Sequence, residues 1–171
     1  MKNNDAVGAS VREALSKRAR ERREDYDLLL LRYANERFLY RLSISPFANY
    51  FVLKGATLLS LWGCEGERAT RDIDLLGFGA PELVTIQEII SKIASIDVKD
   101  GVSFDPTSVR VETIRALQEY GGLRVTLRAR ITTAKIKIQV DIGFGDAVTS
   151  VTRICCRSRQ SRSVVRLFAQ I

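Results

Sequence analysis

Two aspartates separated by a single residue stand inside an apolar stretch of the chain. Asp72 and Asp74 flank Ile73 and are followed by Leu75 and Leu76. Side chains two positions apart on a strand share a face, about 6.6 Å from each other along the backbone. Both carboxylates would therefore point one way, and Ile73 would point into the core.

Carboxylates about 4 Å apart repel by roughly 4 kcal/mol at an intermediate effective dielectric. A divalent cation removes that repulsion, and Mg²⁺ prefers carboxylates together with phosphate oxygens and water. The pair therefore predicts half of a metal site.

A third acid lies in the segment QVDIGFGD. Asp141 falls on a predicted strand that can neighbour the strand of Asp72 and Asp74, at the usual spacing of about 4.8 Å. Three carboxylates together can hold one or two cations, which activate an attacking oxygen and neutralise a leaving pyrophosphate. Asp146 is the alternative to Asp141 as third acid. The acids favour a centre for phosphate chemistry.

The segment Lys54–Thr57, with the sequence KGAT, lies between a predicted strand and a predicted helix start. Free backbone N–H groups and the positive end of a helix suit phosphate there. Gly55 permits a close backbone approach, and the Thr57 hydroxyl can donate to a phosphate oxygen. Each motif alone is weak, because D-x-D and K-G-x-T are common in solvated surface and turns. Their order along the chain (strand, glycine, helix, D-x-D, later strand aspartate) favours a functional site.

The composition excludes several catalytic classes. The chain of 171 residues has no histidine, so it has no Ser-His-Asp triad, no Cys-His pair and no histidine metal ligand. Its three cysteines, Cys64, Cys155 and Cys156, lack C-x-x-C spacing and predict neither a disulfide framework nor a zinc site. Catalysis would have to rest on carboxylates, lysines, hydroxyls or a bound cation.

The net charge of +7 comes mostly from the end of the chain. Residues 151–171 contain five arginines and no acid, so residues 1–150 carry a net charge of only +2. The charge therefore does not predict a nucleic-acid-binding face on the main body. The N-terminus has no apolar signal region, and no run approaches the roughly 18 apolar residues of a membrane span. These features predict a cytoplasmic protein with no membrane partner.

Two helices are expected in the first part of the chain. The first is polar and begins at Ser10, which has the spacing of a capping box with Glu13. The second begins at Asp25 or Tyr26 and ends before Pro46, which disfavours helical geometry at the preceding residue. Its apolar residues recur on one face: Leu28, Leu31, Ala34, Phe38 and Leu42.

Five strands are expected in the remainder, the last two joined by a short turn at 132–134. Helices over 57–62 and 81–95 separate the first three, the second with Pro81 as its first residue. This order predicts an α/β or α+β domain, with a mixed sheet and helices on at least one face. The expected strands are 50–55, 72–79, 108–114, 123–131 and 135–145.

The order of the motifs resembles the nucleotidyltransferase fold, in which a G-S or G-G pair opens a helix, D-x-D lies on the next strand and a further strand carries a carboxylate. More narrowly, FVLKGATLLSLW, RATRDIDLLGFG and IQVDIGFGDAVT look like segments of the AbiEii/AbiGii toxin family. The helix RYANERFLYRLSIS before the first strand also matches that family's pattern. The resemblance covers about residues 26–149. It implies a toxin of an abortive-infection (phage defence) or toxin–antitoxin system.

The resemblance also implies a role for each motif. The nucleotide phosphates would be bound by the segment of four residues Lys54, Gly55, Ala56 and Thr57. The metal, Mg²⁺ or Mn²⁺, would be held by the acids Asp72, Asp74 and Asp141. General-base duty would fall to Asp141. Ala56 stands where the wider fold has Gly or Ser, and the adjacent Thr57 offers a hydroxyl in its place.

The reaction implied by the resemblance is transfer of a nucleotidyl group from an NTP to RNA, with the end of a tRNA as the candidate acceptor. A cognate antitoxin protein is the implied partner. Two other functions stay open: a catalytically inactive module that only binds an antitoxin or other partner, and transfer to protein hydroxyl groups. Labelling of RNA that requires NTP and Mg²⁺ separates the three.

The end of the chain departs from the family pattern. Family members continue into a mostly helical second half with an E-K motif whose lysine contacts the triphosphate, and nothing after Thr149 matches it. The hypothesis is a truncated or frame-shifted member with three parts. They are a basic N-terminal helical segment (1–24), a nucleotidyltransferase-like core (25–150) and an Arg-rich tail that is disordered or non-native (151–171).

Overall fold

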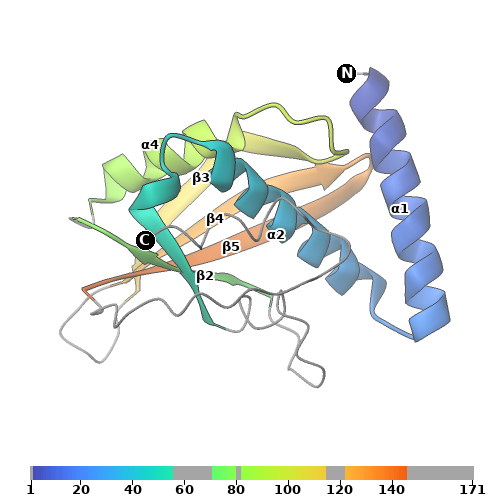
Figure 1. Cartoon of the computed structure of the whole chain (residues 1–171), viewed down its shortest axis with the longest axis horizontal. Coiled ribbons are helices and arrows are strands. Elements are labelled where there is room, and N and C mark those ends of the chain that lie inside the picture. Colours follow the sequence, from blue (N-terminus) through green and yellow to red (C-terminus); the bar gives the residue numbers. More distant parts are fainter. Residues whose placement is uncertain (1, 56–70, 80–81, 115–121, 146–171) are drawn as a thin grey trace.

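The computed structural model describes residues 2–55, 71–79, 82–114 and 122–145 (Figure 1). Within these ranges no helix is long and apolar enough to cross a membrane. The helix predicted over 57–62 lies outside the described residues. The described elements, which form an α+β fold, are α1 (Lys2–Arg22), α2 (Tyr26–Ile44), η1 (Ala48–Tyr50), β1 (Phe51–Lys54), β2 (Ile73–Gly77), α4 (Leu83–Ala94), β3 (Ser103–Ile114), β4 (Gly122–Ile131) and β5 (Ala134–Phe144).

The strands form one mixed sheet in the order β1-β2-β5-β4-β3. β2 and β5 run parallel, whereas the other three neighbouring pairs are antiparallel. β5 is therefore an interior strand between β2 and β4, as Figure 1 shows. The predicted mixed sheet is confirmed.

The β4–β5 hairpin follows from the alternation in the sequence. Every second residue of both strands is buried, whereas the intervening Lys135 and Lys137 are exposed, as a period of two requires. The turn lies at 132–133 and holds Thr132 at φ 51°, which is uncommon for a β-branched residue. The buried residues are Leu123, Val125, Leu127, Ala129, Ile131, Ile136, Ile138, Val140, Ile142 and Phe144. The hairpin register thereby also fixes which polar residues meet on the other face.

β3 is longer than the sequence predicts. It begins at Ser103 rather than at Ser108 and runs through Pro106. An edge strand tolerates proline because one of its sides needs no ladder hydrogen bonds. The pairing with β4 is irregular in this region, and the Ser108 hydroxyl accepts a hydrogen bond from the Arg128 backbone N–H at 2.8 Å. Ser108, the predicted first residue of the strand, therefore lies at an irregularity within β3.

α2 and α4 cover one face of the sheet, where their apolar residues pack against strand residues such as Ile73 and Val140. α2 starts as predicted, because the Asp25 carboxylate accepts a hydrogen bond from the Leu28 N–H at 3.1 Å and caps the helix. α4 begins at Leu83, and the predicted first residue, Pro81, lies outside the described residues.

The buried stripe of α2 is wider than predicted. Ala34, Phe38 and Leu42 are buried as expected, whereas Leu28 and Leu31 are only half-buried. The reason is that α2 contacts α1, α4 and β5, so neighbours cover it on more than one side. Three further leucines are buried: Leu29, Leu30 and Leu39.

α1 begins at Lys2, not at Ser10, so the predicted capping box is wrong. The Ser10 hydroxyl instead donates to the Ala6 carbonyl of the preceding turn at 3.3 Å. A distant loop holds the early turns of the helix. Its Gly101 N–H donates to Asn4 Oδ1 at 2.7 Å, and a Cβ added to Gly8 would lie 3.0 Å from the Gly101 carbonyl oxygen. This long-range contact holds the turns of α1 that precede the predicted start at Ser10, and local sequence pattern does not reveal it.

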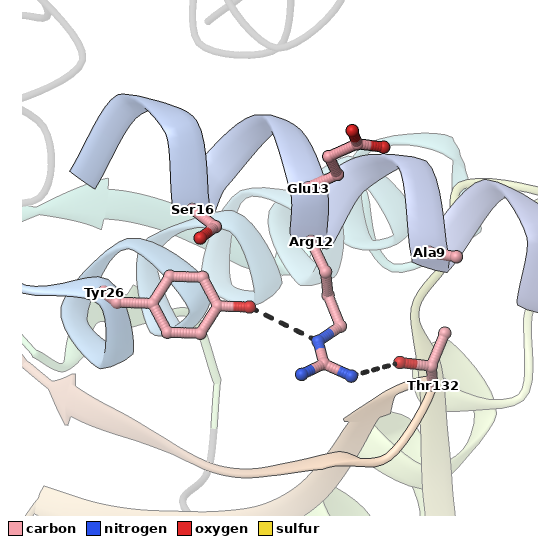
Figure 2. A pocket seen from close by; sticks show the side chains of 6 residues that line it. All are labelled: Ala9, Arg12, Glu13, Ser16, Tyr26 and Thr132. Carbon is pink, nitrogen blue, oxygen red and sulfur yellow. Dashed lines mark hydrogen bonds between the residues drawn. The ribbon is translucent and has the colours of Figure 1, made fainter. Parts of the chain in front are cut away.

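Arg12 links the middle of α1 to two other elements. Its Nε donates to the Tyr26 hydroxyl at the start of α2, at 3.3 Å, and its Nη1 donates to the Thr132 hydroxyl of the β4–β5 turn at 2.9 Å (Figure 2). The same Nη1 donates to the Thr133 hydroxyl at 2.8 Å. An open pocket beside this link is lined by Ala9, Arg12, Glu13, Ser16, Tyr26 and Thr132. The guanidinium thus joins α1, α2 and the hairpin.

α2 also carries a buried arginine that holds the connection between α4 and β3. Arg41 is 2% exposed and pairs with the buried Asp100, with Nη1–Oδ2 2.7 Å and Nη2–Oδ1 3.1 Å. Its guanidinium lies 4.7 Å from the centre of the Phe104 ring. It also donates to three backbone carbonyls of the connection: Ile96, Val98 and Val102. The α4–β3 connection is therefore anchored to α2.

Glu36 on α2 gives the fold a testable dependence on pH. Burial, the largest influence, raises the pKa of Glu36, and Arg37, Arg18 and Arg32 oppose it. Because the folded state binds this proton more tightly than the unfolded state, stability falls as the pH rises from the ordinary glutamate pKa through the raised value. Glu36→Gln should raise Tm by a few degrees at pH 8 and lose that advantage below about pH 4. Thermal unfolding at both pH values checks this; an equal shift in the exposed Glu88→Gln would contradict it.

Candidate active site

A row of five charged residues, one from each strand, crosses the sheet on the face opposite α2 and α4; we refer to it as the charged row. Glu112 of β3 lies opposite Arg124 of β4, which lies opposite Asp141 of β5. Asp141 in turn lies beside Asp74 of β2, which lies opposite Lys54 of β1. The charges alternate in sign except at the centre, where two carboxylates are neighbours. The centre of the charged row is therefore where an added cation would be most stabilised.

The predicted geometry of the D-x-D strand is confirmed. Ile73 is fully buried, whereas Asp72 and Asp74 are half-buried on the opposite face. Asp74 and Asp141 are partners on parallel neighbouring strands, which lie about 4.8 Å apart. Burial first, and then the charges of Asp72 and Asp141, raise the pKa of Asp74, while Lys54 lowers it. The three acids form one electrostatically coupled group.

Arg124 holds the third acid with both ends of its guanidinium. Its Nε donates to Asp141 Oδ1 at 2.9 Å and its Nη2 donates to Asp141 Oδ2 at 2.8 Å, a bidentate and charge-assisted arrangement. Gln139 Nε2 lies 3.4 Å from Asp141 Oδ2 and 3.5 Å from Asp72 Oδ2, and so connects two of the acids. Asp141 is thereby fixed on the face it shares with Asp74.

The glycine of the KGAT segment lies directly against an acid of the D-x-D strand. Gly55 has φ 73°, in the left-handed region that favours glycine, and a Cβ added to it would lie 2.9 Å from the carboxyl carbon of Asp74. The contact arises because Gly55 directly follows β1, whose last residue, Lys54, is paired with Asp74. The sheet thus joins two motifs that are separated in the sequence.

Gly55→Ala should destabilise the protein by more than backbone strain alone. A left-handed conformation costs a non-glycine residue about 1–2 kcal/mol, and here the new methyl group would also displace the Asp74 carboxylate. The matched control is Gly79→Ala. Gly79 has φ 94°, and among the described residues no atom beyond its chain neighbours lies within 4 Å of an added Cβ. Urea unfolding of both variants checks this. Equal losses of unfolding free energy would show that the contact with Asp74 does not constrain residue 55.

The structure brings together the predicted site residues that it describes. They are Lys54, Gly55, Asp72, Asp74 and Asp141, from β1, β2 and β5 and the residues flanking them. Ala56, Thr57 and the alternative third acid Asp146 lie outside the described residues. The roles assigned to all of these residues stay predictions.

The chemistry of the acids suits a divalent cation, but their observed arrangement is not yet a three-acid site. Carboxylate oxygens are the ligands that Mg²⁺ prefers. Burial first, and then repulsion from Asp72 and Asp141, raise the pKa of Asp74, and a cation would relieve the repulsion. Both oxygens of Asp141, however, accept hydrogen bonds from Arg124. Within the described ranges, no three His, Cys, Asp or Glu side chains are placed to hold a metal ion. The ion pair between Arg124 and Asp141 would have to open before Asp141 could bind a cation.

Sequence reasoning missed three residues around the acids: Arg124, Gln139 and Glu112. A signal for Arg124 was present, because a two-residue turn at 132–133 pairs residue 124 with residue 141 by counting outwards along the hairpin. Gln139 shares a strand face with Asp141 by the same alternation. Glu112 had no such signal, since the register between β3 and β4 shifts along the strand.

Comparison with known families supports the sequence resemblance. The family described as "Nucleotidyl transferase AbiEii toxin, Type IV TA system" matches residues 37–161. The match includes all five strands and the whole charged row, and it extends past residue 150 into the Arg-rich tail. A comparison with curated proteins gives no match. Because the family match spans well over half of the chain, the protein belongs to the AbiEii nucleotidyltransferase toxin family of Type IV toxin–antitoxin systems.

Proposed function

We propose that the protein is a metal-dependent toxin that transfers a nucleotidyl group from an NTP to RNA, with the end of a tRNA as the first acceptor to test. One observation carries the proposal: at the centre of the charged row, Asp74 lies beside Asp141 while the Gly55 backbone lies against Asp74. Nucleotidyl transfer needs acids next to a backbone that phosphate can approach closely. The fold supplies this juxtaposition from distant parts of the sequence.

In the proposed reaction, an acceptor hydroxyl oxygen attacks the α-phosphorus of the NTP, and the bond from that phosphorus to pyrophosphate breaks. Asp72, Asp74 and Asp141 would hold Mg²⁺ or Mn²⁺, which supplies charge neutralisation at the attacking and leaving oxygens. Asp141 is the candidate general base that takes the hydroxyl proton. The segment Lys54–Thr57 would bind the triphosphate through backbone N–H groups and its Lys and Thr side chains.

The direct test is labelling of RNA by the purified full chain. Each NTP, labelled at the α-phosphate, is incubated with Mg²⁺ and either tRNA or total RNA. RNA labelling that is lost in Asp72→Ala and kept in Asp97→Asn supports the proposal, because Asp97 is an exposed acid of the α4–β3 connection and is not one of the three acids. Label on protein would favour transfer to protein hydroxyls instead. No label from a wild-type chain would favour a module that acts only by binding a partner.

The Type IV description of the family implies an antitoxin counterpart. We propose that this antitoxin opposes the transfer reaction in the cell, as part of a phage-defence system. Expression of the wild-type chain without antitoxin should then stop growth, whereas expression of Asp72→Ala should not. Growth arrest by both chains would show that the toxicity does not depend on Asp72.

A further inference from the structure

We propose that Arg124 is a two-position residue: it holds Asp141 while the acids lack a divalent cation, and it turns to Glu112 when the cation takes the Asp141 carboxylate. The inference rests on the proposed function only in assuming that the three acids bind a divalent cation. Arg124 is then a positioning residue that sets how tightly the cation binds.

The first observation is that Arg124 and a cation would compete for the same group. Arg124 donates to both carboxylate oxygens of Asp141, at 2.9 and 2.8 Å, within the group of acids. A cation bound to that carboxylate would lie next to the guanidinium, and like charges at such separations repel strongly. Arg124 therefore already neutralises the carboxylate that a cation would need, although it lies on the side of Asp141 away from Asp74.

The second observation is that Arg124 has another carboxylate within its own row. Glu112 is its register partner on the far side from Asp141, on the edge strand β3. The charge of Glu112 contributes to the raised pKa of the Arg124 guanidinium, after the larger effects of Asp141 and Asp72. The Arg124 side chain is 43% exposed, so it can turn without disturbing the core. Glu112 is exposed as well.

The third observation concerns what would keep Asp141 in place after the arginine leaves. Gln139 lies within 3.4 Å of Asp141 and 3.5 Å of Asp72, on the strand that carries Asp141. The Asp141 side chain is only 19% exposed and so has little freedom to turn away. The Asp141 carboxylate can therefore stay beside Asp74 without the ion pair. A purely structural role for Arg124 would predict the opposite, namely a loosened and weaker site in its absence.

The experiment is titration of Mn²⁺ into the full chain, with free Mn²⁺ followed by electron paramagnetic resonance and with no nucleotide or acceptor added. Arg124→Met should bind Mn²⁺ about tenfold more tightly than the wild-type chain, since charge-assisted hydrogen bonds no longer compete. Glu112→Gln should bind it about threefold more weakly, because the alternative exposed partner of the arginine is lost. Tighter Mn²⁺ binding in Arg124→Met together with weaker Mn²⁺ binding in Glu112→Gln is the result expected if Arg124 alternates between Asp141 and Glu112.

Matched controls separate the switch from a general change of charge. Arg130→Met removes an exposed charge from the same strand, and Glu88→Gln removes one from α4. Neither should change Mn²⁺ affinity appreciably.

If Arg124→Met weakens Mn²⁺ binding, or changes it no more than Arg130→Met does, the proposal is wrong. An unchanged affinity in Glu112→Gln would overturn the role of Glu112. Absence of Mn²⁺ binding in both the wild-type chain and Arg124→Met would overturn the metal site itself, whereas binding without RNA labelling would overturn only the proposed reaction.

Discussion

Asp74→Asn should reduce nucleotidyl transfer by at least about 10²-fold while raising the Tm of the cation-free protein. The loss follows because a bound cation supplies several kcal/mol of charge stabilisation in such reactions, and each factor of ten in rate corresponds to about 1.4 kcal/mol. The gain follows because burial and the charges of Asp72 and Asp141 raise the pKa of Asp74. A group with a raised folded-state pKa lowers stability as the pH rises through that value. The gain in Tm should therefore be present at neutral pH and vanish in acid.

RNA labelling and thermal unfolding, each with and without Mg²⁺, measure both halves of this expectation. The wild-type chain should gain Tm when Mg²⁺ is added, because a ligand that binds only the folded state stabilises it. Asp74→Asn should gain less. Asp97→Asn is the control, since it removes an exposed acid outside the charged row. A lower Tm for Asp74→Asn than for the wild-type chain without Mg²⁺ would show that the acids are not in repulsive contact.

Arg41→Met should lower the free energy of unfolding by about 3–5 kcal/mol, the usual cost of removing one partner of a buried ion pair. Asp100, 6% exposed, would be left as a buried charge, and three backbone carbonyls of the α4–β3 connection would lose a donor. Urea unfolding measures the loss. Arg37→Met on the same helix is the control and should cost about 1 kcal/mol, because Arg37 mainly lies over the rings of Tyr33 and Tyr40.

The double variant Arg41→Met with Asp100→Leu tests the reason for the loss. Replacing both partners of a buried ion pair by apolar residues is often far less costly than removing one. The double variant should therefore recover part of the stability lost by Arg41→Met alone. If it is less stable still, the carbonyl contacts of Arg41, rather than the stranded charge of Asp100, account for the loss.

Much of the fold could be predicted from the sequence because its strands alternate clearly. The hairpin of β4 and β5, the strand around Ile73 and the start of α2 at Asp25 are all read from local pattern. The errors concern elements whose ends depend on distant partners. α1 is held by Gly101 of a remote loop, and β3 extends through Pro106 because it is an edge strand. Local periodicity carries no information about either.

The candidate site was predictable in its acids but not in their surroundings. Asp72, Asp74 and Asp141 stand out because charges inside apolar strands need an explanation. The sequence predicted that the strand of Asp141 can neighbour the D-x-D strand, and the sheet confirms this neighbourhood. The parallel direction of the pairing was not predicted. Arg124 did not stand out, because an arginine on an alternating strand looks like ordinary solvent-exposed surface. The register of the hairpin, counted outwards from its two-residue turn, is what shows that Arg124 lies opposite Asp141.

A ribosome makes β1, β2, β3 and β4 before it makes β5, yet β5 is the strand that enters between β2 and β4. Until β5 has been synthesised and inserted, Asp74 lacks its neighbour Asp141 and the charged row is broken in the middle. A nascent chain that stops before residue 141 therefore cannot carry the acid centre at all. The acid centre is thus complete only once β5 has paired with both β2 and β4.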